Sequence, residues 1–132
     1  MLELTIRENV YQFNFGMGFL RDINKKYQKP VDGLPDAKEN VGLNMMVAGL
    51  RVKDCEYLAE VLESANKAQN PRVTRQLIDA YIDDPDTDID QLFDTVMDFL
   101  KTSNATKNVV NQFLKNLDEY EAEQKAKQKA EK

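Results

Sequence analysis

The sequence contains no histidine, and Cys55 is its one cysteine among 132 residues. Histidine is the side chain most often used as a general acid or base near neutral pH, and it is the commonest metal ligand. A single cysteine cannot form an internal disulfide, which is typical of a reducing cytoplasm. We therefore expect no catalytic centre, no bound metal and no cofactor.

Long apolar runs and an excess of positive charge are also missing. No stretch approaches the ~20 apolar residues that a membrane span needs, and Met1-Leu2-Glu3-Leu4 lacks the basic region and apolar run of a signal peptide. The chain has 23 acidic and 18 basic side chains, a net charge of -5. Because an acidic surface repels phosphate groups, we expect no binding to nucleic acid or to a membrane.

The first fifteen residues alternate in the manner of a β-hairpin. The pattern predicts strands near 2–6 and 10–15, joined at Arg7-Glu8-Asn9, where Asn9 can take the left-handed turn conformation. Two strands alone are marginal in water, so the hairpin must pack on helices or pair with another subunit. The alternating apolar residues are Leu2, Leu4 and Ile6 in the first strand, and Tyr11, Phe13 and Phe15 in the second.

Helical periodicity dominates the rest of the chain. A helix with Phe19, Leu20, Ile23 and Tyr27 on one face is expected to stop before Lys29-Pro30. The turn formers in residues 30–39 predict a loop. Further helices are predicted at 40–52, after a cap at Asp54, from Asn70-Pro71, after a capping box of Thr87 and Asp90, and around Val109 to Leu117. The predicted fold class is α+β, mainly α: an N-terminal β-hairpin followed by five or six helices.

The predicted helix at 40–52 is apolar on nearly every side. Such a helix is either central to the core or presents one side to a partner. Its adjacent methionines cannot both face the same core, and methionine is an adaptable residue at protein-binding surfaces. The residues predicted to bind a partner or a second copy are Leu43, Met45, Met46, Val47 and Leu50.

Two motifs suggest ligand sites but lack essential parts. Gly16-Met17-Gly18 follows a strand, yet Arg21 stands where a dinucleotide fingerprint needs its third glycine, which favours a plain strand-to-helix turn. Alternate aspartates from Asp84 to Asp90 resemble a calcium loop, but Ile89 replaces its obligatory glycine and Thr95 its final glutamate. Helix capping is the simpler interpretation of the aspartates. Cys55, on an apolar helical face, is interpreted as a packed thiol.

The block from Tyr11 to Tyr27 resembles the opening of a known family. It contains the pattern Phe-x-Phe-Gly-x-x-Phe-Leu-Arg-Asp-Ile, which is similar to the start of tail assembly chaperones from long-tailed phages of Gram-positive bacteria. In that family a helix rich in Gly, Leu and Met follows, and then short acidic helices. The segments Val41 to Leu50 and Asp88 to Lys101 occupy the corresponding places, so the resemblance covers most of residues 1–118.

The resemblance implies a non-catalytic chaperone. Members of the family are made in the host cytoplasm, bind the phage tape measure protein during tail morphogenesis, and are absent from the mature virion. A longer frameshifted product recruits tail tube protein in many of them. Surplus apolar surface and a marginal hairpin predict a homo-oligomer. Two alternatives stay open: a minor structural head–tail or tail-completion protein of a phage, and a helical enzyme or regulator.

The predicted domain organisation is one tail-assembly-chaperone-like domain over residues 1–120 and a tail over 121–132. The tail contains only Glu, Lys, Gln and Ala. It has helical propensity but no apolar face, so we expect it to be flexible when free.

Overall fold

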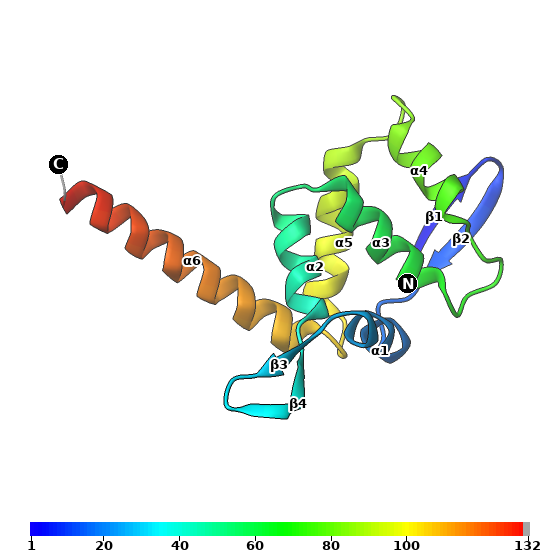
Figure 1. Cartoon of the computed structure of the whole chain (residues 1–132). Coiled ribbons are helices and arrows are strands. Elements are labelled where there is room, and N and C mark those ends of the chain that lie inside the picture. Colours follow the sequence, from blue (N-terminus) through cyan, green and yellow to red (C-terminus); the bar gives the residue numbers. More distant parts are fainter. Residues whose placement is uncertain (131–132) are drawn as a thin grey trace.

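The computed structural model describes residues 1–130 and confirms an α+β fold that is mainly helical (Figure 1). A body of short elements is followed by a long final helix that extends away from it (Figure 1). In chain order the elements are β1 (Leu2–Ile6), β2 (Asn9–Phe13), α1 (Met17–Lys26), β3 (Gln28–Val31), β4 (Leu34–Asn40), α2 (Gly42–Arg51), α3 (Cys55–Asn66), α4 (Arg75–Asp83), α5 (Ile89–Thr102) and α6 (Lys107–Ala130).

The N-terminal hairpin forms where it is predicted, but its second strand covers Asn9–Phe13 in place of 10–15, and its turn is different. Strands β1 and β2 are antiparallel, and Ile6 pairs with Asn9. Arg7 and Glu8 therefore form a two-residue turn, with φ angles of 47° and 73°. The prediction that Asn9 takes the left-handed conformation is wrong, because Asn9 already pairs in β2 and the two central residues of the turn, Arg7 and Glu8, have the positive φ angles. The buried side chains of the second strand fix the hairpin on the helices.

A second hairpin replaces the loop predicted at residues 30–39. Strands β3 and β4 are antiparallel, and the register shifts between Pro30 and Val31. Gly33 has a φ of 79°, which permits the tight connection between the strands. The hairpin projects from the body (Figure 1) and its side chains are largely exposed. Because neither face is buried, the sequence carries no alternating apolar pattern to reveal the strands.

The helix caps agree only partly with the sequence prediction. Asp54 caps α3 as expected, and its side chain accepts a hydrogen bond from a backbone N–H. Helix α4 is capped by Thr74, not opened by Asn70-Pro71, whose peptide bond is cis and precedes the helix. Helix α5 is capped by Asp88. The predicted capping box at Thr87 is wrong, because that hydroxyl donates to the carbonyl of the preceding helix instead.

Buried hydrogen bonds join distant parts of the chain around the core. The fully buried amide of Asn66 donates to the carbonyls of Gln12 and Pro71 and accepts from the N–H of Val73. Ser103 Oγ donates to the carbonyl of Phe15, 2.6 Å away. These bonds tie β2 to the end of α3, and the segment between β2 and α1 to the turn between α5 and α6.

Candidate partner-binding surfaces

The structure places four of the five predicted partner-binding residues in the core of the chain itself. Leu43, Met46, Val47 and Leu50 of α2 are buried, while Met45 is half-buried. The sequence left two alternatives for this helix: a position central to the core, or one side turned to a partner. The structure favours the position central to the core, because α2 packs against α1, α3, α5 and α6. A binding role for these α2 residues stays a prediction. Of the five, only Met45 could contact a partner without opening the core.

Two glycines explain how a ten-residue helix can have so many neighbours. A Cβ at Gly42 would overlap the backbone of Ile23, and a Cβ at Gly49 would overlap the ring of Tyr57. Neighbouring elements therefore approach α2 closely at these two positions. The glycines in the 40–52 segment are the signal that could have identified α2 as a core helix.

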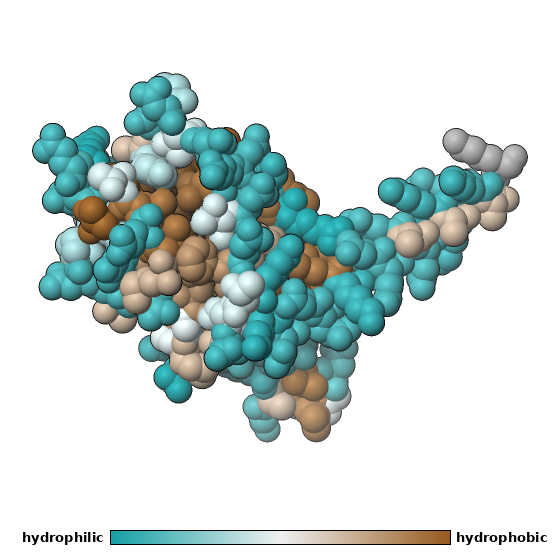
Figure 2. All heavy atoms as spheres, turned by 180° about the vertical axis from the view of Figure 1, so that it is seen from behind, coloured by the Kyte–Doolittle hydropathy of each residue, from teal (hydrophilic) through white to brown (hydrophobic). Residues whose placement is uncertain are grey.

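Part of the apolar surface that stays exposed lies on α6, which the sequence prediction did not select. Other exposed apolar side chains, among them Leu34 and Val52, lie elsewhere in the chain. Val110 of this helix is fully buried, but Val109 is 50% exposed and Tyr120 is 60% exposed. Phe113 and Leu117 lie between them at helical spacing and are half-buried. Together Val109, Phe113, Leu117 and Tyr120 form one continuous strip, here called the α6 strip. Apolar surface is visible where the final helix leaves the body, and the outer part is mostly hydrophilic (Figure 2).

One arginine holds α6 against the body. Arg51, at the end of α2, pairs with Asp118 at 2.8 Å and with Glu121 at 2.9 Å. The hydrogen bond that the guanidinium donates to Asp118, with the charge of Glu121, raises the pKa of Arg51. Helix α6 runs without a break from Lys107 to Ala130, across the predicted boundary at residue 120. The division into a domain over 1–120 and a tail over 121–132 stays a prediction. The last two residues of the predicted tail, 131 and 132, lie outside the described residues.

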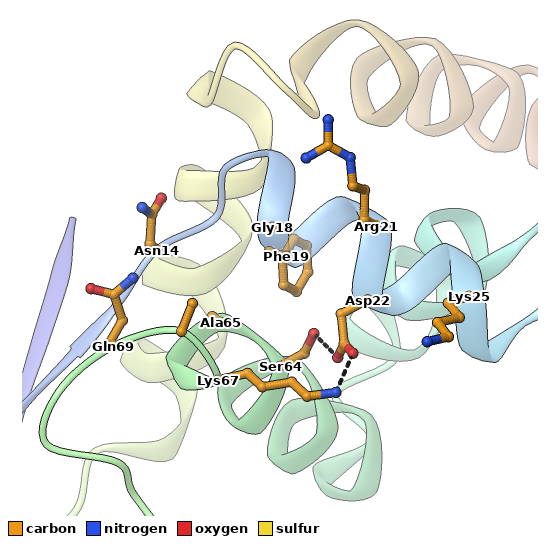
Figure 3. Close-up of a pocket in the computed structure, with 11 residues that line it drawn as sticks. Asn14, Gly18, Phe19, Arg21, Asp22, Lys25, Ser64, Ala65, Lys67 and Gln69 are labelled. Carbon is orange, nitrogen blue, oxygen red and sulfur yellow. Dashed lines mark hydrogen bonds and ion pairs between the residues drawn. The ribbon is translucent and has the colours of Figure 1, made fainter.

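A cavity of about 470 Å³ opens between α1 and the end of α3, and we call it the α1 cavity (Figure 3). Phe19 and Ala65 line its interior, and Gly18 lies at its wall. A Cβ built on Gly18 would meet no other atom within 4 Å, so this wall is open. Gly16 precedes α1 as its cap residue, which confirms that the Gly16-Met17-Gly18 segment is a strand-to-helix turn.

Asp22 is the carboxylate of the α1 cavity. Ser64 Oγ donates to it at 2.7 Å, Lys67 Nζ at 2.6 Å, and Lys26 forms an ion pair with it at 3.2 Å. Burial alone would raise the pKa of Asp22, but the hydrogen bonds from Lys67, Ser64 and Lys26 outweigh it and lower the pKa to about 2. The carboxylate is therefore ionised and fixed, and it joins α1 to α3.

The remaining candidate groups do not assemble into a reactive site. Within residues 1–130, no cluster of acidic or cysteine side chains is arranged to hold a metal ion. Asp84 and Asp88 instead accept hydrogen bonds from nearby backbone N–H groups. Cys55 is exposed. The prediction of a packed thiol is wrong, because Cys55 is the first residue of α3 and lies outside the part of the helix that packs on the core.

The body is largely helical, and α6 carries apolar side chains that water reaches. The described helices also include none that is long and apolar enough to cross a bilayer. A family model described as "Phage tail assembly chaperone protein, TAC" matches residues 3–115, and the chain belongs to this family. No curated protein and no solved structure matched the chain.

Proposed function

We propose that the protein is a non-catalytic chaperone that binds the tape measure protein of a phage infecting a Gram-positive bacterium. The family supports a role in tail assembly. The observation that carries the finer proposal is the α6 strip, an apolar surface on a helix that extends from the body (Figures 1 and 2). In this proposal the protein acts in the host cytoplasm, helps to recruit tail tube protein and is absent from the mature virion.

The spacing of the α6 strip suits a helical client. Its residues recur every three or four positions, so they form one ridge that can enter the groove of another helix. A client with its own apolar stripe would cover side chains that water now reaches, at a gain of roughly 25 cal/mol for each Å² of apolar surface. The resemblance implies a long helical tape measure protein as that client.

Co-expression with the tape measure protein of the same phage tests this surface. The double variant Val109→Glu/Tyr120→Glu should fold, because both side chains are at least half exposed, and should lose co-purification of the client. The matched control Asn108→Glu/Gln112→Glu adds the same charge to exposed positions on another side of α6 and should keep the client. Equal co-purification by both variants would show that the strip does not bind the tape measure protein.

The alternative, a structural head–tail or tail-completion protein, predicts a different location. A chaperone should be abundant in the lysate and missing from purified particles, whereas a structural protein should be present at a fixed copy number. Mass spectrometry of purified virions separates the two, and detection of this chain in the particles would favour the structural role.

A further inference from the structure

The rim of the α1 cavity carries positive charge that the protein itself does not balance. Arg21 and Lys25 are exposed, lie one helical turn apart on α1 and line the cavity. In residues 1–130 neither takes part in an ion pair. The one carboxylate in the lining, Asp22, is already matched by lysines (Figure 3). The cavity therefore combines an apolar interior with uncompensated cations, in a chain whose net charge is -5.

The complementary surface is the turn between α4 and α5, residues 83–88, here called the aspartate turn. Its four carboxylates are exposed, and none is in an ion pair within the described part of the chain. Pro85 is exposed between two of these aspartates, so the turn presents an apolar ring flanked by negative charge. The four acidic residues are Asp83, Asp84, Asp86 and Asp88.

We propose that the aspartate turn of a second copy of this chain docks into the α1 cavity. Pro85 of the second copy would enter the apolar interior, and the flanking carboxylates would pair with Arg21 and Lys25. The charges of the two surfaces are complementary, and both surfaces lie on the same chain. Complementary charge favours this partner over another basic or neutral surface.

The position of the two surfaces decides what kind of assembly results. Helix α1 and the turn between α4 and α5 lie at opposite ends of the body (Figure 1). The aspartate turn of one molecule therefore cannot reach the α1 cavity of the same molecule. A contact between two different surfaces is heterologous, and it repeats in an open chain unless a rotation closes it into a ring. Each added copy presents a free cavity at one end and a free aspartate turn at the other. This inference does not depend on the identity of the client.

Variants that block one surface each provide the test. Gly18→Trp places a ring in the cavity through its open wall, and Gly18→Ala is the control that adds a Cβ without filling it. Asp83→Lys/Asp86→Lys reverses charge on the turn while keeping the hydrogen-bonding carboxylates of the other two aspartates. Its matched control is Asp94→Lys/Asp98→Lys, at exposed positions of α5.

Sedimentation velocity of the whole protein at low and high salt measures the outcome. The unmodified protein and both controls should form oligomers larger than dimers that grow with concentration at low salt and dissociate at high salt. Each blocked variant alone should be a monomer. An equimolar mixture of the two blocked variants should form a one-to-one complex and nothing larger, because one open cavity and one intact turn remain.

Three results would overturn the proposal: a monomeric unmodified protein at low salt, oligomers that persist in either blocked variant, or a mixture of blocked variants that stays monomeric. Circular dichroism checks that Gly18→Trp is folded. If it is not, Arg21→Glu/Lys25→Glu blocks the same site at two exposed positions, and it should give the same monomer and the same one-to-one complex in the mixture.

Discussion

The two neighbouring methionines of α2 differ in their surroundings, and this difference can be measured. Met46 is completely buried, whereas Met45 is half-buried. Met46→Glu should unfold the domain, because a buried carboxylate without a partner costs several kcal/mol. Met45→Glu should leave the domain folded, since its charge can reach water. Urea denaturation followed by circular dichroism compares the two, and equal stability of both variants would contradict the position of Met46.

The pKa of Asp22 predicts a loss of stability in acid. Its folded value of about 2 lies below the ordinary 3.8, so the unfolded chain takes up the proton first as the pH falls. The stabilisation is therefore complete above about pH 5 and is lost as the pH falls toward 2. The difference in pKa corresponds to about 2 kcal/mol. Denaturation curves recorded between pH 5 and pH 2 measure the loss.

The variant Asp22→Asn separates this carboxylate from the general effect of acid. It should be less stable than the unmodified protein at pH 7, and its stability should fall by about 2 kcal/mol less between pH 5 and pH 2. Asp36→Asn, at an exposed position of β4, is the control and should follow the unmodified protein. If the stability of Asp22→Asn fell between pH 5 and pH 2 as much as that of Asp36→Asn, Asp22 would not be the cause of the loss of stability in acid.

At the scale of elements, the outer part of α6 should contribute little to the free energy of folding. Beyond Tyr120 its side chains are almost all exposed, and Arg51 keeps Asp118 when Glu121 is removed. Exposed ion pairs contribute little. Truncation after Tyr120 should therefore change the Tm by no more than about 2 °C, which corresponds to under ~0.5 kcal/mol. Differential scanning calorimetry measures the change, and a larger drop would show that the segment stabilises the body.

Elements with a buried face were predictable, and elements without one were not. The first hairpin and the helical faces follow from apolar residues at periods of two and 3.6, because one side of each packs on the core. Both faces of the second hairpin are largely exposed, so its sequence has no alternating apolar pattern, and turn formers such as Pro30 and Gly33 predicted a loop instead. The caps at Thr74 and Asp88 depend on the exact residue at which each helix begins, which periodicity does not define.

The partner-binding surface was harder to predict than the fold. An excess of apolar residues selected α2, but its glycines let neighbouring elements cover nearly all of it. For the last helix the sequence predicted only its position, and it could not show that α6 leaves the body while its apolar face continues. The family was predictable because the Tyr11 to Tyr27 block forms a local pattern, and the family match supports it.

At the scale of the whole molecule, the hydrogen bonds between distant residues impose an order on folding. The carbonyl of Phe15 is bonded to Ser103, 88 residues later, and the N–H of Asn14 is bonded to the carbonyl of Ala65. During synthesis at ~5–20 residues per second, Phe15, two residues after the first hairpin, must wait roughly 4–18 s for Ser103. Throughout that time the apolar side of β2 has no completed core to cover it.

We therefore expect the N-terminal block to be the last part of the chain to reach its native packing during synthesis. Chains halted at residue 60 should show rapid amide hydrogen exchange in β1 and β2, because a lone hairpin is marginal in water. Chains that expose residues 1–110 should show slow exchange there. Protection of the hairpin in the shorter chain would contradict this order. A nascent chain with such a delay is vulnerable to premature pairing of its strands with other chains until α5 has emerged.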